Sequence, residues 1–141
     1  MPDTAAETRT VVVERDIPHP PQKVWRAVIQ APLIEEWLMK NDFEPVVGHK
    51  FNLRSPPQPQ WDGVIDCKVL DIEPPSRLAY SWTTMGLATV VVLTLTPTGA
   101  GTHVRVEQSG FGEGHERNIK GAEWGWKSFT EKLETVVAGL A

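Results

Sequence analysis

A long apolar stripe at helical spacing occupies the last part of the chain. From Asn118 to Leu140 the apolar residues recur at alternating steps of three and four. These residues are Ile119, Ala122, Trp126, Phe129, Leu133, Val136 and Leu140. The spacing predicts one continuous helix of about six turns with a single apolar face. A helix of this kind needs a large apolar partner, which the rest of the chain must supply.

The middle of the chain has the period of β-strands, with apolar residues at alternate positions. This pattern predicts an antiparallel sheet that has one solvated face. The expected strands are Thr8–Ile17, Gly48–Arg54, Gly63–Ile72, Arg77–Thr84, Thr89–Thr96 and Thr102–Gln108. In the strand Gly63–Ile72 the alternation shifts before Leu70, as a β-bulge would cause.

Two short helices are expected between the first strand and the second. The segments Gln22–Gln30 and Leu33–Met39 have helical spacing, and Pro32 separates them. The whole order predicts an α+β fold, in which a curved antiparallel sheet of about six strands grips the long C-terminal helix. With 141 residues and a mass of 15.7 kDa, residues 1–141 are expected to form one domain.

Composition and charge exclude several classes of function. The formal net charge of −4 argues against nonspecific binding of nucleic acid, which needs a basic surface. The single cysteine and four scattered histidines lack the spacing of a metal site, so no metal or organic cofactor is expected. No apolar run reaches the roughly 18–20 residues that span a bilayer, and Met1–Thr10 lacks the apolar core of a signal peptide. We therefore expect a cytoplasmic protein with no membrane partner.

A series of short motifs in order resembles a known family. The motifs are His19–Trp25, Pro32–Trp37, Pro45–Gly48, Val69–Pro75, Arg77–Trp82, Leu93–Pro97, Ser109–Phe111 and Gly125–Trp126. Together they resemble the START-like superfamily (SRPBCC, helix-grip fold), and within it the domain related to the activator of the ninety-kilodalton heat-shock chaperone's ATPase. The chain departs from the family pattern at Gln30-Ala31, Cys67 and Gln108, where Thr-Asp, Gly and His are usual.

The resemblance implies an apolar cavity between the long helix and the concave sheet, closed at one end by the two short helices. The wall residues that it implies are Trp37, Phe51, Tyr80, Trp82, Val91, Leu93, Trp126 and Phe129. The alternation of the strands adds Cys67 and Gln108 to the inward face. Gln108 and Tyr80 are candidate polar anchors, whereas Cys67 is interpreted as a small buried hydrophobic residue.

Six tryptophans against one tyrosine and four phenylalanines make the indole ring the dominant aromatic group. Trp25 is interpreted as structural. Trp61 lies in the proline-rich loop Ser55–Asp62, where it either covers a cavity mouth or belongs to a protein interface. Trp124 points about 200° away from Trp126 on a helix, which places it near the cavity entrance or in a dimer contact.

These features predict a domain that binds a hydrophobic or aromatic small molecule by stacking, with Gln108 or an indole N–H orienting it. The resemblance implies two alternatives. One is a protein-interaction module that stimulates a heat-shock chaperone's ATPase, and the other is an enzyme of the cyclase or hydrolase type that uses the same cavity. No nucleophile with a neighbouring base emerges, so no catalytic residue is assigned. The chain is expected to be a monomer or a homodimer.

Overall fold

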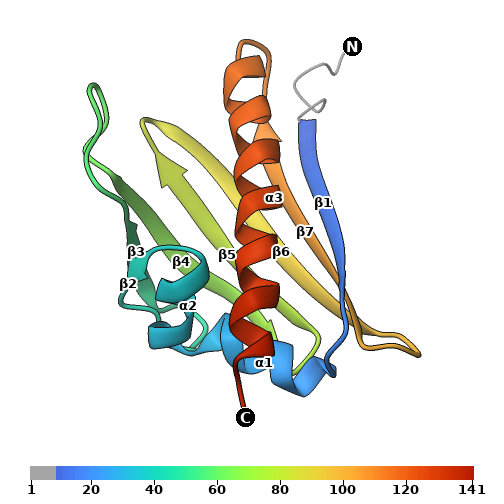
Figure 1. Cartoon of the computed structure of the whole chain (residues 1–141). Coiled ribbons are helices and arrows are strands. Elements are labelled where there is room, and N and C mark those ends of the chain that lie inside the picture. Colours follow the sequence, from blue (N-terminus) through green and yellow to red (C-terminus); the bar gives the residue numbers. More distant parts are fainter. Residues whose placement is uncertain (1–8) are drawn as a thin grey trace.

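One antiparallel sheet and three helices make up the computed structural model, which describes residues 9–141. The seven strands lie in the order β1-β7-β6-β5-β4-β3-β2 (Figure 1). Their bounds are β1 (Arg9–Ile17), β2 (Lys40–Asn41), β3 (Lys50–Arg54), β4 (Val64–Glu73), β5 (Arg77–Thr84), β6 (Leu87–Pro97) and β7 (Thr102–Phe111). The helices are α1 (Pro21–Ile29), α2 (Ala31–Trp37) and α3 (Glu116–Ala138).

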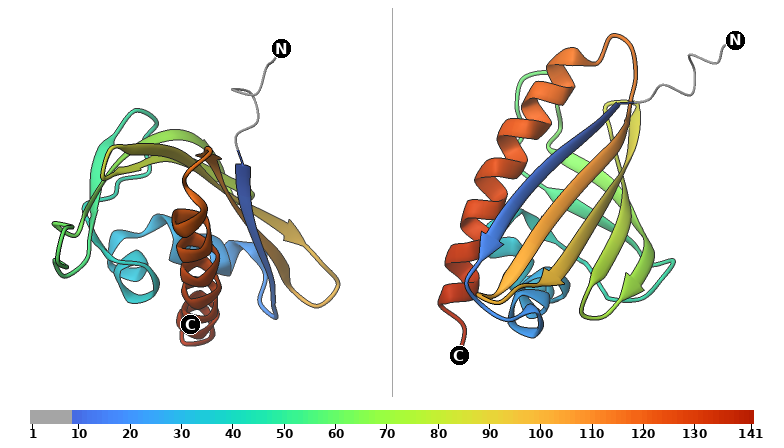
Figure 2. Two further views of the ribbon diagram at one scale, coloured as in Figure 1. Left: turned by 90° about the horizontal axis from the view of Figure 1, so that it is seen from above. Right: turned by 90° about the vertical axis from the view of Figure 1, so that its right-hand side faces the viewer.

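The sheet curves around α3, which crosses its concave face, as the view from above in Figure 2 shows. The two short helices α1 and α2 lie beside the C-terminal end of α3, and α3 contacts both of them as well as β1 and β7. The β3–β4 loop and the β5–β6 turn lie at the opposite end, near the N-terminal end of α3 (Figure 1). This arrangement confirms the predicted α+β helix-grip fold.

The elements agree with the sequence prediction except in small details. The strand β2 is not among the expected strands, because two residues are too few to show a period. Helix α2 begins and ends two residues before the predicted Leu33–Met39, and Thr8, the predicted start of the first strand, lies outside the described residues. The predicted shift in β4 is confirmed, since Val69 pairs with Tyr80 whereas Asp71 pairs with Ala79. The intervening Leu70 is 43% exposed.

The buried face of α3 differs from the apolar stripe in its last turns. The buried residues are Trp126, Thr130, Leu133 and Val137, whereas Val136 and Leu140 are only partly buried. Helix α3 packs against the sheet on one side and against α1 and α2 on another. Its buried residues therefore do not coincide with the apolar stripe. Thr130 is accommodated because its hydroxyl donates a hydrogen bond to the carbonyl oxygen of Trp126 at 2.8 Å.

Membrane-spanning helices and metal-binding clusters are both absent from residues 9–141. None of the helices in this part of the chain is both long enough and apolar enough to cross a bilayer. The same residues contain no group of three or more His, Cys, Asp or Glu side chains arranged to hold a metal ion.

An ionic cluster lies on the outer face of the sheet, where β1 and β7 pair. Nδ1 of His103 is 2.7 Å from Oδ1 of Asp16, and Nε2 is 2.8 Å from Oε2 of Glu14. Carboxylates only accept hydrogen bonds, so both contacts together require the protonated imidazolium. Its hydrogen bonds to Glu14 and then Asp16 raise the pKa of His103 above its ordinary value of 6.5.

Stability is therefore expected to depend on pH through His103. The imidazolium stabilises the folded protein fully at pH values below 6.5, the pKa of this histidine in the unfolded chain. This contribution is lost as the pH rises through the higher pKa of His103 in the folded protein. Between about pH 5 and pH 9, the urea stabilities of the wild type and His103→Gln should differ most below pH 6.5, and the difference should shrink as the pH rises above that value. His19→Gln is the control, because the only side-chain hydrogen bond of His19 within residues 9–141 is with Lys23, not with a carboxylate. A constant difference across this range would contradict the assignment.

Candidate functional site

The space between α3 and the sheet is divided into a packed half and an open half. The packed half, next to α1 and α2, retains a void of about 10 Å³, which is close to the minimum for one water molecule. The open half, beside the N-terminal half of α3, is a groove of about 440 Å³. A groove of this size falls in the range of small-molecule pockets.

We call the open half the α3 groove. Its wall consists of Met39, Trp61, Ile65, Trp82, Thr84, Met85, Leu87, Thr89, Gln108, Phe111, Arg117, Asn118, Gly121, Ala122, Trp124, Gly125, Trp126 and Phe129. These residues come from α3, from the ends of β4 to β7, from the β5–β6 turn, from the loop before β4 and, for Met39, from the segment between α2 and β2. Four of the six tryptophans are among them, so the aromatic excess of the sequence is concentrated in this wall.

Two glycines on α3 keep the helix surface back from the groove. Gly121 and Gly125 are about one turn apart, and both line the groove. A Cβ atom added at Gly121 would meet nothing within 4 Å, and one added at Gly125 would meet only the Phe129 ring, at 3.7 Å. Neither glycine has a positive φ, so neither backbone conformation nor packing requires it. Glycine costs a helix interior about 1 kcal/mol relative to alanine.

The polar groups on the inner wall bond to one another in a short series. The indole Nε1 of Trp126 donates to Oε1 of Gln108 at 2.8 Å, and Nε2 of Gln108 donates to the Thr89 hydroxyl at 2.9 Å. That hydroxyl donates to the carbonyl oxygen of Trp82 at 2.8 Å. The expected polar anchors, Gln108 and an indole N–H, are thus bonded to each other. Their network fixes the orientation of Trp126.

Trp61 is held at the rim of the groove by a second pair of hydrogen bonds. Its Nε1 donates to the Thr84 hydroxyl at 2.8 Å, and this hydroxyl donates to the carbonyl oxygen of Val64 at 3.0 Å. Trp124 lies on the same wall with 74% of its surface exposed. Both tryptophans line the groove, and their roles, at a cavity mouth or in an interface, stay predictions.

The structure distributes the eleven predicted wall residues over three places. The α3 groove contains Trp61, Trp82, Gln108, Trp126 and Phe129. The packed void is lined by Trp37, Phe51, Tyr80 and Leu93. Cys67 and Val91 are buried in the core and line neither space. The sequence pattern alone could not separate these sets, because all of them except Trp61 have inward parity, belong to the helical stripe or lie in the motifs of one family.

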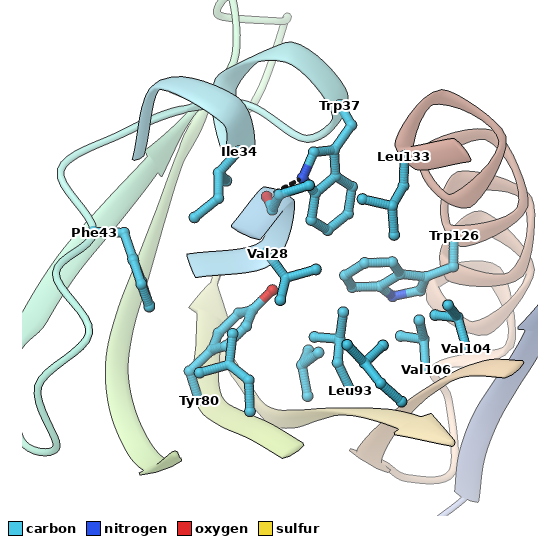
Figure 3. Packing of buried hydrophobic residues seen from close by; sticks show 14 of the residues in the cluster. Val28, Ile34, Trp37, Phe43, Tyr80, Leu93, Val104, Val106, Trp126 and Leu133 are labelled. Carbon is cyan, nitrogen blue, oxygen red and sulfur yellow. Dashed lines mark hydrogen bonds between the residues drawn. The ribbon is translucent and has the colours of Figure 1, made fainter. Parts of the chain in front are cut away.

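The packed half is closed by Trp37 of α2. Its indole Nε1 donates to the carbonyl oxygen of Ala27 in α1 at 2.9 Å, as the dashed line in Figure 3 shows. The ring therefore lies between the short helices and Leu133 of α3 (Figure 3). A residue that the resemblance assigns to the cavity wall thus helps to fill that end of the cavity.

Burial raises the pKa of two other ionisable groups, the thiol of Cys67 and the phenol of Tyr80. Desolvation, followed by the nearby carboxylates of Asp66 and Asp42, raises the pKa of the Cys67 thiol to about 12. A thiol in this state is a poor nucleophile, in agreement with its interpretation as a small buried hydrophobic residue. Desolvation also raises the pKa of the Tyr80 phenol, whose oxygen points toward Val28 (Figure 3).

The sequence analysis missed several groove residues. Met85 and Leu87 flank the β5–β6 turn, where Met85 has a φ of 53°, and no periodicity marks such a turn. Gly121 and Gly125 could have been found, since two glycines four residues apart in a helix that otherwise carries an apolar stripe are an energetic anomaly. Arg117 gave no signal, because a charged residue near a helix end is ordinary.

A family model matches most of the chain. The match covers residues 18–138 and is described as "Activator of Hsp90 ATPase homolog 1-like protein". The chain belongs to this family. The resemblance seen in the motifs is thereby confirmed, and the matched residues include the whole wall of the α3 groove.

Two solved structures are similar to this member of the Hsp90 ATPase activator homolog 1-like family over most of its length. The crystal structure of protein MLL2253 from Mesorhizobium loti is 52% identical, covers 94% of this chain and 99% of its own, and has a TM-score of 0.88. The solution structure of protein BH1534 from Bacillus halodurans is 28% identical, covers 92% of this chain and 96% of its own, and has a TM-score of 0.78.

A third structure shares the fold of this family member. DynU16, a protein in the dynemicin biosynthetic locus, is 24% identical, with a TM-score of 0.80. The alignment covers 98% of this chain but only 48% of DynU16. A search of curated protein sequences returned no match.

Proposed function

We propose that the chain binds a hydrophobic small molecule, preferably an aromatic one, in the α3 groove. Pockets for such ligands are mostly apolar with a few polar groups, and the wall of the groove has this composition. The partly exposed ring of Trp82, whose centroid lies 5.5 Å from that of the buried Trp126, offers a stacking surface. Trp61 and Trp124 add two further indoles at the rim.

The observation that carries the proposal is the open space beside Gly121. A helix that buries Trp126 completely has no structural need for two glycines on the same wall one turn earlier. Residues that lower stability without a structural return are typical of functional sites, where selection retains a less stable arrangement. The space that the glycines leave is the space that a ligand would fill.

Filling that space is expected to abolish binding. Gly121→Leu places a side chain in the groove, and leucine is a good helix former, so the fold should be retained. The probe is N-phenyl-1-naphthylamine, monitored by its own fluorescence and by quenching of the tryptophans. We expect its dissociation constant to rise by about tenfold or more.

Lys127→Leu is the matched control, because it adds the same side chain at an exposed position of α3 outside the groove wall. It should bind the probe as the wild type does. The proposal is wrong if the wild type does not bind the probe, or if folded Gly121→Leu binds it unchanged.

A second candidate is a module that stimulates a chaperone ATPase. It is favoured by the family description and by Trp124, whose exposed ring could enter a protein interface. The test is the ATPase rate of the ninety-kilodalton heat-shock chaperone with and without this protein. An increase that Trp124→Ala removes would favour this candidate, and an unchanged rate would count against it.

A cyclase or hydrolase using the same space is the third alternative. Within residues 9–141, the wall of the α3 groove contains no carboxylate, imidazole or thiol. Besides four indole N–H groups, its polar groups are the hydroxyls of Thr84 and Thr89, the amides of Gln108 and Asn118, and the guanidinium of Arg117. Because none of these is a general base at neutral pH, we assign no reaction to the groove.

A further inference from the structure

The distribution of polar groups along the α3 groove indicates how a bound ligand would be oriented. We propose that the occupant is an amphipathic anion, with an apolar aromatic body inside the groove and an anionic headgroup at the mouth beside Arg117. This inference rests on the proposed function and specifies the class of ligand.

Most hydrogen-bonding groups of the inner wall are already paired, and the indole N–H of Trp82 is the donor there that has no hydrogen-bond partner among residues 9–141. The hydrogen-bonding groups of Trp126, Gln108 and Thr89 are engaged with one another or with backbone. Those of Trp61 and Thr84 are likewise engaged. Away from Trp82, a polar ligand group placed here would lose its water and either remain unpaired or break one of these bonds, at a cost that apolar atoms do not incur.

The mouth has the opposite character, because Arg117 is the one charged side chain among residues 9–141 that lines the wall. It is exposed, and no carboxylate of residues 9–141 lies within ion-pair distance of it. Its neighbour Glu116 is instead paired with Arg9 of β1, at 3.6 Å. The described part of the chain thus leaves a guanidinium at the edge of an apolar groove with its donors available.

The chemistry of this cation selects an anion with at least two oxygen atoms. A guanidinium presents paired N–H groups in a plane, which match a carboxylate, sulfonate or phosphate in bidentate geometry. The amide of Asn118, also at the mouth, could donate to the same group. The protein as a whole carries a net charge of −4, so its overall electrostatic field does not attract an anion. The attraction would come from Arg117 alone.

The test compares two probes that share one aromatic skeleton. N-phenyl-1-naphthylamine is neutral, and 1-anilinonaphthalene-8-sulfonate is the same molecule with a sulfonate. We expect the wild type to bind the sulfonate about fivefold more tightly, with a preference that falls as the salt concentration rises. Arg117→Gln should remove this preference, so that the two probes bind with similar affinity.

Lys127→Gln is the matched control, because it removes one positive charge from an exposed position of α3 outside the groove wall. It should retain the fivefold preference. Gly121→Leu should weaken both probes, which shows that both occupy the groove.

The possible outcomes separate the inference from the proposed function. If the wild type binds neither probe, the proposed function fails and the inference falls with it. If it binds both equally, or if the preference persists in Arg117→Gln, the groove binds hydrophobic molecules but the anionic class is wrong. A preference lost equally in Lys127→Gln would assign it to net charge and overturn the role of Arg117.

Discussion

Replacing Trp126 with alanine is expected to lower the free energy of unfolding by about 4 kcal/mol. The indole is 2% exposed, and its ring centroid lies 5.5 Å from that of Trp82 and 5.6 Å from that of Phe129. Alanine removes these contacts and also leaves Oε1 of Gln108 without the N–H that it accepts from. Both losses act in the folded state only, so they add in the same direction.

Urea unfolding monitored by far-UV circular dichroism measures this loss. Trp126→Phe separates its two parts, because phenylalanine keeps most of the ring contacts and lacks the N–H; its cost should lie between those of wild type and alanine. Trp124→Ala is the control on the same helix, and its exposed ring predicts a change within about 0.5 kcal/mol. A loss below about 1 kcal/mol for Trp126→Ala would mean that the ring does not hold α3 on the sheet.

The second large effect is expected at Gly63, at the end of the loop that carries Trp61. Its φ is +82°, and a Cβ atom there would lie 2.1 Å from the carbonyl oxygen of Ser55. The same two residues are joined by a hydrogen bond from the Ser55 N–H to the Gly63 carbonyl at 2.8 Å. The Cβ atom would clash with a backbone oxygen, so no rotation of a side chain can relieve the contact. Gly63→Ala should therefore destabilise the protein by about 3 kcal/mol.

Gly48→Ala isolates the conformational part of that cost. Gly48 has a φ of +92°, but a Cβ atom added there would meet nothing within 4 Å. Only the left-handed backbone penalty applies, which is about 1 kcal/mol. Chemical denaturation of both variants gives the difference between them. Equal losses would show that the loop yields to the Cβ atom, and that the approach to Ser55 does not constrain it.

The fold could be predicted from the sequence because its main signals are periodic. The three-and-four spacing from Ile119 to Leu133 and the alternation in Arg77–Thr84 each reflect the geometry of one element. The bulge at Leu70 was visible for the same reason, since one extra residue reverses the parity of the rest of the strand. The two-residue strand β2 has no period, and only its pairing with β3 defines it.

The site was predictable only in part, because it depends on distances between elements. Inward parity placed Tyr80 and Trp82 on one face of β5, but the structure assigns the first to the packed void and the second to the open groove. What separates them is how closely α1 and α2 approach the sheet, and no local pattern encodes that distance. The hydrogen bonds of Gln108 with Trp126 and Thr89 could not be predicted either, since alternation gives the direction of a side chain and not its hydrogen-bond partners.

The division between packed and open halves has a consequence for local motion along α3. Leu133 and Val137 are completely buried in its C-terminal half, whereas the first turns, around Gly121, border the groove. Backbone amides exchange with solvent through local openings whose free energy depends on the density of buried contacts. The amides of the first turns should exchange with deuterium sooner than those around Leu133. An occupant of the groove would then slow exchange at one end of a single helix, and the protected amides would map its position without a ligand-bound crystal.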